Sequence, residues 1–130
     1  MGKSIRVVVI AMLSLSIGAF AFADDKDADA KKPKHSIKDV MAKALKGKLN
    51  KKVISGDATE KEKLELLDMY ISLVENKAPK GDAASWQKFS GAAALAAAKV
   101  AVGREGAIKE LKTATNCAKC HKAHKPPAKK

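Results

Sequence analysis

Apolar residues recur at three- and four-residue intervals along four stretches of this chain, which is the pattern of amphipathic helices. The first stretch begins near Ser36 and predicts a helix of about five turns, given 3.6 residues per turn. The second begins at Thr59, and Glu62 three residues later completes the signature of a capping box. Gly56 lies between the two stretches, so the pattern predicts a break there.

The third predicted helix begins at Asp82 or Ser85, after a loop rich in proline, glycine and lysine. The fourth follows Gly103 and ends at Pro126, because proline cannot continue a helix. No stretch shows the strict alternation of a β-strand. The pattern therefore predicts an all-α fold, an antiparallel four-helix bundle.

Each predicted helix has an apolar face that should point into the core. Between Gly91 and Ala98 that face is mostly alanine, which either lets helices approach closely or reflects high helix propensity alone. The faces comprise Ile37, Val40, Met41, Ala44, Leu45 and Leu49; Leu64, Leu67, Ile71 and Val74; Trp86, Phe89, Ala93, Ala96 and Val100; and Ile108, Leu111, Ala114, Ala118 and His121.

The first 23 residues have the pattern of a secretory signal peptide. Lys3 and Arg6 precede an apolar run, and Ala21-Phe22-Ala23 provides a small-residue cleavage site. Cleavage there would leave 107 of the 130 residues, which is enough for one small domain in the periplasm or another exported location. An uncleaved anchor is the alternative, although about 20 apolar residues are normally needed to span a bilayer.

The remaining chain divides by composition. Residues 24–34 are short and charged, which predicts a flexible leader, and residues 35–125 contain all four apolar patterns and form the predicted domain. Residues 126–130 form a basic tail.

Cys117-Ala118-Lys119-Cys120-His121 matches C-x-x-C-H, the short signature of covalent haem attachment. Two thiols three residues apart can each form a thioether with one vinyl group of the porphyrin. The imidazole of His121 then becomes the proximal iron ligand. We therefore expect one haem c, bound through Cys117 and Cys120, on the last helix.

Two other interpretations of the cysteines remain open. An exported chain can form a Cys117–Cys120 disulfide, but so small a loop stabilises little and leaves His121 unexplained. Zinc usually takes four ligands, and only His35 and His124 remain outside the motif to complete such a site.

The chain is strongly basic, with a formal net charge of +12. Without Lys3 and Arg6 the charge becomes +10, which favours acidic protein partners. We do not expect nucleic-acid binding, because no cluster of aromatic residues is available to stack bases.

From about His35 to Lys125, the sequence resembles the class II c-type cytochromes, the cytochrome c-prime family. These have a signal peptide, four helices and a haem motif near the C-terminus of the last helix. The resemblance extends past the motif, where His124 stands at the family's ring position and Lys125 at its basic position. It implies a distal residue on the first helix, and family members often pair through their first two helices, so a homodimer is one arrangement it implies.

Met41 is the residue that the resemblance places at the distal position, because its surroundings are similar to those of the methionine-ligated, low-spin branch. The basic residue often found one turn earlier in that branch is replaced by Ile37. In the high-spin branch the distal position is occupied by an apolar residue that does not bind the iron. In this chain Leu45 or Val40 would be that residue. Met69 lies on the second predicted helix, outside the pattern of Leu67 and Ile71, and is the weaker candidate.

These observations leave two functions in competition. A Met41/His121 iron would carry electrons, and C-terminal lysines would orient acidic redox partners. A five-coordinate iron would bind NO or CO instead. An enzyme such as a peroxidase is not expected, because the predicted distal helix offers no acid–base group. The lysines concerned are Lys119, Lys122, Lys125, Lys129 and Lys130.

Overall fold

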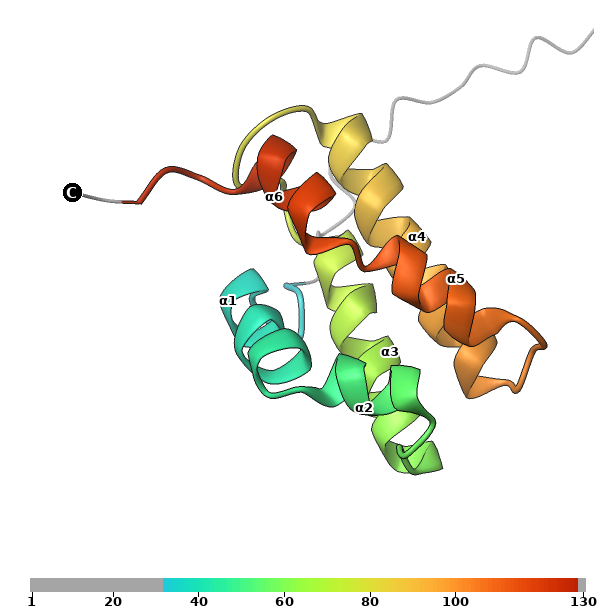
Figure 1. Ribbon diagram of the computed structural model, residues 1–130. Helices are drawn as coiled ribbons and strands as arrows, with labels where there is room; N and C mark the ends of the chain where they lie inside the picture. Colours follow the sequence, from blue (N-terminus) through green and yellow to red (C-terminus); the bar gives the residue numbers. More distant parts are fainter. Residues whose placement is uncertain (1–31, 129–130) are drawn as a thin grey trace, which may run out of the picture. The chain divides into compact units, whose positions relative to one another are not determined.

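A computed structural model describes residues 32–128 of the chain, and these residues belong to one compact unit (Figure 1). The predicted signal peptide (residues 1–23), residues 24–31 of the leader and the last two residues of the basic tail lie outside the described residues. Within residues 32–128 every regular element is a helix and no strand occurs, so the predicted all-α class is confirmed. No helix in this part of the chain is both long enough and apolar enough to cross a membrane.

The first predicted helix begins where expected, but it is not continuous. Ser36 and Asp39 form a capping box at its start. The segment then consists of α1 (Ile37–Val40), a π-helix η1 (Met41–Lys46) and α2 (Leu49–Ser55). The prediction of a single five-turn helix is therefore wrong.

The break falls at Gly47 and Lys48. The Gly47 amide donates to the carbonyl of Ala42, five residues back, so the chain widens into a π turn. A Cβ at residue 47 would collide with the Lys43 carbonyl, and Lys48 adopts the left-handed conformation with φ 64°. The apolar periodicity passes over this break, because Leu49 resumes the same face.

Helix α3 (Glu60–Glu75) has the predicted Thr59–Glu62 capping box, but it buries a different face from the one predicted. Leu64 is 58% exposed and Ile71 is 42% exposed. The buried apolar side chains are Leu66, Met69, Tyr70 and Leu73, while Leu67 and Val74 of the predicted face are half-buried.

Helix α3 has two apolar faces, and the face with the larger side chains is the one that is buried. The buried face includes Tyr70 and Met69, which remove more apolar area from water than the alternative, and the Tyr70 hydroxyl finds a partner in Asn50.

Helix α4 (Ala83–Ala101) begins at Asp82, whose carboxylate accepts from the Ser85 amide, and so the first of the two predicted starts is the observed one. It packs against α3 and also against α5 (Ala107–Ala114). Its predicted face is confirmed: Trp86, Ala93, Ala96 and Val100 are buried and Phe89 is half-buried.

The fourth predicted helix is divided in two. Helix α5 ends at Ala114, and α6 (Cys117–His124) begins after Asn116, whose side chain accepts from the Lys119 amide. Asparagine is a strong N-cap residue, so it starts a new helix here. In Figure 1, α6 follows α5 as a separate short helix, and the loop before α4 curves past it.

Candidate functional site

Helix α6 presents the motif residues in one turn. Asn116 fixes the start of the helix, so Cys117 is its first residue, and Cys120 and His121 follow one turn later on the same side. Cys117 and His121 are exposed, and Cys120 is half-buried. All three functional groups of C-x-x-C-H therefore lie within about one helical turn.

Both thiols are free, so the Cys117–Cys120 disulfide does not form in this structure. The Sγ atom of Cys117 lies 3.6 Å from the carbonyl oxygen of Thr115. Burial raises the pKa of the Cys120 thiol, and the neighbouring Cys117 adds to the effect.

Two adjoining hollows lie beside α6. The first is lined mainly by apolar side chains of η1, α3 and α4 and has a volume of about 50 Å³, and the second, of about 360 Å³, reaches toward Pro79 and Pro126. The lining residues common to both are Met41, Leu45, Trp86, Cys117, Cys120 and His121. The hollows are thus two parts of one site between η1, α4 and α6.

The structure brings Met41 together with the three motif residues, although they are far apart in sequence. Met41 is half-buried and lies at the first position of η1. A π turn is a rare conformation, so Met41 lies at an unusual point of the backbone.

Of the other candidate distal residues, Leu45 lines both hollows. Val40 and Met69 are fully buried in the core and line neither hollow. Met69 thus has the environment of a packing residue, whereas Met41 faces the space beside α6.

The two histidines outside the motif are held by other residues of the fold, although His124 also lines the second hollow. The ring of His124 is buried against Trp86 and Phe89, with ring centroids 5.4 Å and 5.9 Å away. The Nε2 atom of His35 lies 3.1 Å from Asp68 on α3. Each is therefore a structural residue in this arrangement.

Three residues of the site's surroundings were not found from the sequence. Tyr70 and Thr115 line the first hollow, and Thr115 also lies just before the start of α6. Asn50 forms hydrogen bonds with both Tyr70 and Thr115. Asparagine and threonine are ordinary surface residues, so composition gave no sign of them. Tyr70 could have been singled out as the chain's one tyrosine.

The donor chemistry fits a covalently bound haem. The site offers two free thiols for thioethers, one imidazole beside them and one thioether sulfur on a facing wall, within an apolar lining. A porphyrin is larger than the first hollow, so it would need the space of both, with α6 and η1 further apart. Among residues 32–128 no three His, Cys, Asp or Glu side chains gather as a metal-binding cluster.

Neither a protein-family model, nor a curated protein, nor a solved structure matches this chain.

Proposed function

We propose that this protein is an exported monohaem c-type cytochrome that transfers electrons. Cys117 and Cys120 would hold the haem as thioethers, His121 would be the proximal iron ligand, and Met41 would be the distal ligand. The observation that carries the proposal is that the motif of α6 and Met41 of η1 line the same hollows.

The haem supplies an iron that alternates between the ferric and ferrous states. The chain's own residues control its surroundings. Trp86, Phe89 and Leu73 keep the lining apolar and limit water, and a thioether ligand favours the ferrous state relative to a second nitrogen. With both axial positions filled by side chains, little rearrangement accompanies electron transfer.

The proposal includes the arrangement of the helices. The α1–η1–α2 segment, α3, α4 and the α5–α6 segment would be the four arms of an antiparallel bundle, with the haem between the first and last arms. The observed packing of α3 on α4 and of α4 on α5 is consistent with this order. Export to the periplasm rests on the sequence of residues 1–23.

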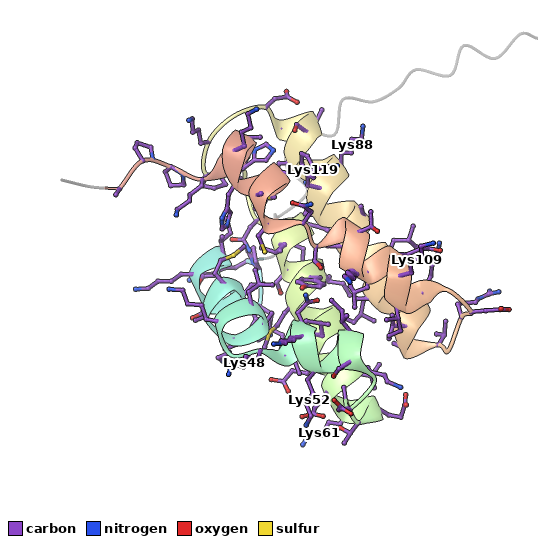
Figure 2. All side chains as sticks on the ribbon, in the orientation of Figure 1. Lys48, Lys52, Lys61, Lys88, Lys109 and Lys119 are labelled. Carbon is purple, nitrogen blue, oxygen red and sulfur yellow. The ribbon has the colours of Figure 1, made fainter. Side chains whose placement is uncertain are left out.

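An acidic protein is the partner we propose. Lysines project from several helices (Figure 2), and Lys119 and Lys122 are exposed on α6 itself. Lys46 and Lys125 also line the second hollow, so positive charge lies close to the proposed haem. Long-range attraction would orient an acidic partner toward this side.

One observation favours a second function, the binding of NO or CO. Leu45 lines the same two hollows as Met41. If Leu45 rather than Met41 covered the iron, the sixth position would stay open to a small gas.

Optical spectroscopy of the purified protein separates the two functions. The spectra of the ferric and dithionite-reduced forms should be recorded with and without CO, for the wild type and for Met41→Leu and Met69→Leu. Leucine retains most of the volume of methionine and has no sulfur to bind iron, so both variants should fold. Met69→Leu is the matched control, because Met69 lies in the core.

Electron transfer predicts a low-spin spectrum with a sulfur-to-iron charge-transfer band that CO does not change. Met41→Leu should abolish the band and admit CO, while Met69→Leu should retain it. A high-spin wild type that binds CO and is unaffected by Met41→Leu would favour the gas-binding function. Intact mass should show one added haem, absent from Cys117→Ser/Cys120→Ser, and a wild type without haem would contradict both functions.

A further inference from the structure

Three polar side chains meet in the interior beside the first hollow. The Tyr70 hydroxyl on α3 donates to Asn50 Oδ1 on α2, at 2.8 Å. The amide of Asn50 donates to Thr115 Oγ1, at 3.2 Å, and Thr115 Oγ1 donates to the carbonyl of Leu111, at 2.8 Å. We call Tyr70, Asn50 and Thr115 the buried polar triad.

Only one direction of donation satisfies every member of the triad. The Leu111 carbonyl can only accept, so the Thr115 hydroxyl must donate to it and can accept from Asn50. The Asn50 amide nitrogen therefore faces Thr115, and its oxygen faces Tyr70, which donates. Burial raises the pKa of Tyr70, so the phenol keeps the proton that this arrangement requires.

The three side chains are paired with one another, and two of them are buried while Thr115 is half-buried. Tyr70 is 1% exposed and Asn50 is 9% exposed. Within the described part of the chain, no buried side-chain nitrogen or oxygen lacks a partner. A buried amide without partners is costly, so the three side chains hold one another in a single geometry.

Thr115 connects the triad to the candidate site. It is the C-cap residue of α5, directly after Ala114 and directly before the Asn116 cap of α6. Tyr70 and Thr115 also line the first hollow together with Cys117. The triad thus ties the break between α5 and α6 to α2 and α3.

We propose that the buried polar triad is a positioning device for α6. By fixing Thr115 relative to α2 and α3, it sets where the C-x-x-C-H turn begins and which side of that turn faces the hollows. Its role toward haem rests on the proposed function, but its effect on α6 is a property of the polypeptide.

Hydrogen–deuterium exchange of the purified protein tests the proposal. Asn50→Leu, Tyr70→Phe and Thr115→Val each break the triad with little change in volume. Thr113→Val is the matched control: Thr113 makes the same bond to a carbonyl four residues back, to Lys109 at 3.0 Å, but is exposed and outside the triad. Thr115→Ser keeps the hydroxyl and should behave as the wild type.

We expect exchange in residues 117–124 to rise roughly tenfold in the triad variants, as the loss of one buried hydrogen bond implies. Exchange in the middle of α4 should rise less, and Thr113→Val should leave residues 117–124 unchanged. In haem-loaded protein the reduction potential should fall in Thr115→Val and recover in Thr115→Ser, because a looser α6 admits water and favours ferric charge.

An equal rise of exchange in α4 and α6 would overturn the proposal, because it would give the triad only a general role in stability. So would unchanged exchange in residues 117–124. These results are independent of the proposed function: purified protein without haem contradicts that function, while a local rise in α6 exchange still supports the positioning role.

Discussion

The Nδ1 atom of His124 lies 2.8 Å from the carbonyl oxygen of Lys80. This contact joins the C-terminal end of α6 to the loop before α4, and His124 Nε2 lies 3.1 Å from the Ser85 hydroxyl at the start of α4. The ring is 2% exposed and lies edge-on to Trp86. Helix α6 is therefore held at both ends, by His124 at its last residue and by Thr115 just before its first.

Gly81 is the residue that permits this contact. Its φ is +80°, and a Cβ there would lie 2.8 Å from the carbonyl oxygen of Ala123. Gly81→Ala should lower the free energy of unfolding by about 2–3 kcal/mol, since a backbone cost of about 1–2 kcal/mol is added to the displacement of α6.

Gly56→Ala is the control for this prediction. Gly56 has a similar φ of +85°, but a Cβ at this residue would have no neighbour within 4 Å, so only the backbone cost of about 1–2 kcal/mol applies. Urea denaturation of both variants measures the difference. Equal losses of unfolding free energy in the two variants would mean that the close approach of Gly81 to α6 does not contribute to stability.

Asp68 should make the stability of the protein depend on acid pH. Hydrogen bonding to Lys34, and then to His35, lowers the pKa of this carboxyl below its ordinary value of 3.8. A lowered folded-state pKa stabilises the protein at pH values above 3.8, and the stabilisation is lost as the pH falls through the folded-state pKa.

Urea midpoints between neutral pH and pH 3 measure this dependence. Asp68→Asn should be less stable than the wild type at neutral pH, and the gap should close as the pH falls toward the acid end. The gap should also shrink in high salt, because the Lys34–Asp68 pair is largely exposed. A gap that stays constant with pH would rule out the carboxylate as its cause.

The alanines of α4 should differ in their tolerance of larger side chains. Ala97 is 1% exposed, whereas Ala92 on the same helix is exposed. Ala97→Leu should lower the free energy of unfolding by about 1–3 kcal/mol, because the larger side chain has no space between the packed helices. Ala92→Leu should change it by less than about 0.5 kcal/mol.

Thermal denaturation of the two leucine variants checks this prediction. A large difference would mean that the alanines allow close helix approach. Similar melting temperatures would leave helix propensity as the reason for the alanine-rich run.

Trp86 provides a fluorescence signal for the site. It is the chain's one tryptophan, and it lines both hollows. Haem absorbs where indole emits, so the fluorescence of haem-loaded protein should be strongly quenched. Cys117→Ser/Cys120→Ser should restore the emission, and equal emission from both proteins would place any haem away from Trp86.

The sequence predicted the helix starts well and the breaks poorly. Capping depends on residues three positions apart, so Ser36–Asp39 and Thr59–Glu62 could be recognised directly. The breaks at Lys48 and Asn116 interrupt an apolar pattern that continues across them. The spacing of apolar residues does not reveal a break in a helix when the residues after the break lie on the same face as those before it.

The face of α3 depends on tertiary contacts. Leu64 and Leu66 belong to competing apolar faces, and periodicity alone does not distinguish between the two. The partnership of Tyr70 with Asn50, twenty residues earlier, distinguishes them, and such a pair is not visible in a single sequence. The convergence of Met41 with Cys117, Cys120 and His121 was expected from the family resemblance, and their side chains do line common hollows.

The π-helix η1 has a consequence for how this chain can change in length. A π turn holds one residue more than an α turn, so η1 can be viewed as an α-helix with a single residue inserted. Deleting one residue between Ala42 and Lys46 would restore regular α-helical bonding. Because the π turn absorbs the inserted residue, the residues on either side of it should keep their faces, and Val40 should stay in the core. Loss of one codon in this segment should thus preserve the apolar face of the chain before it, whereas the same loss within α3 or α4 would rotate one part of the helix against the other by about 100°.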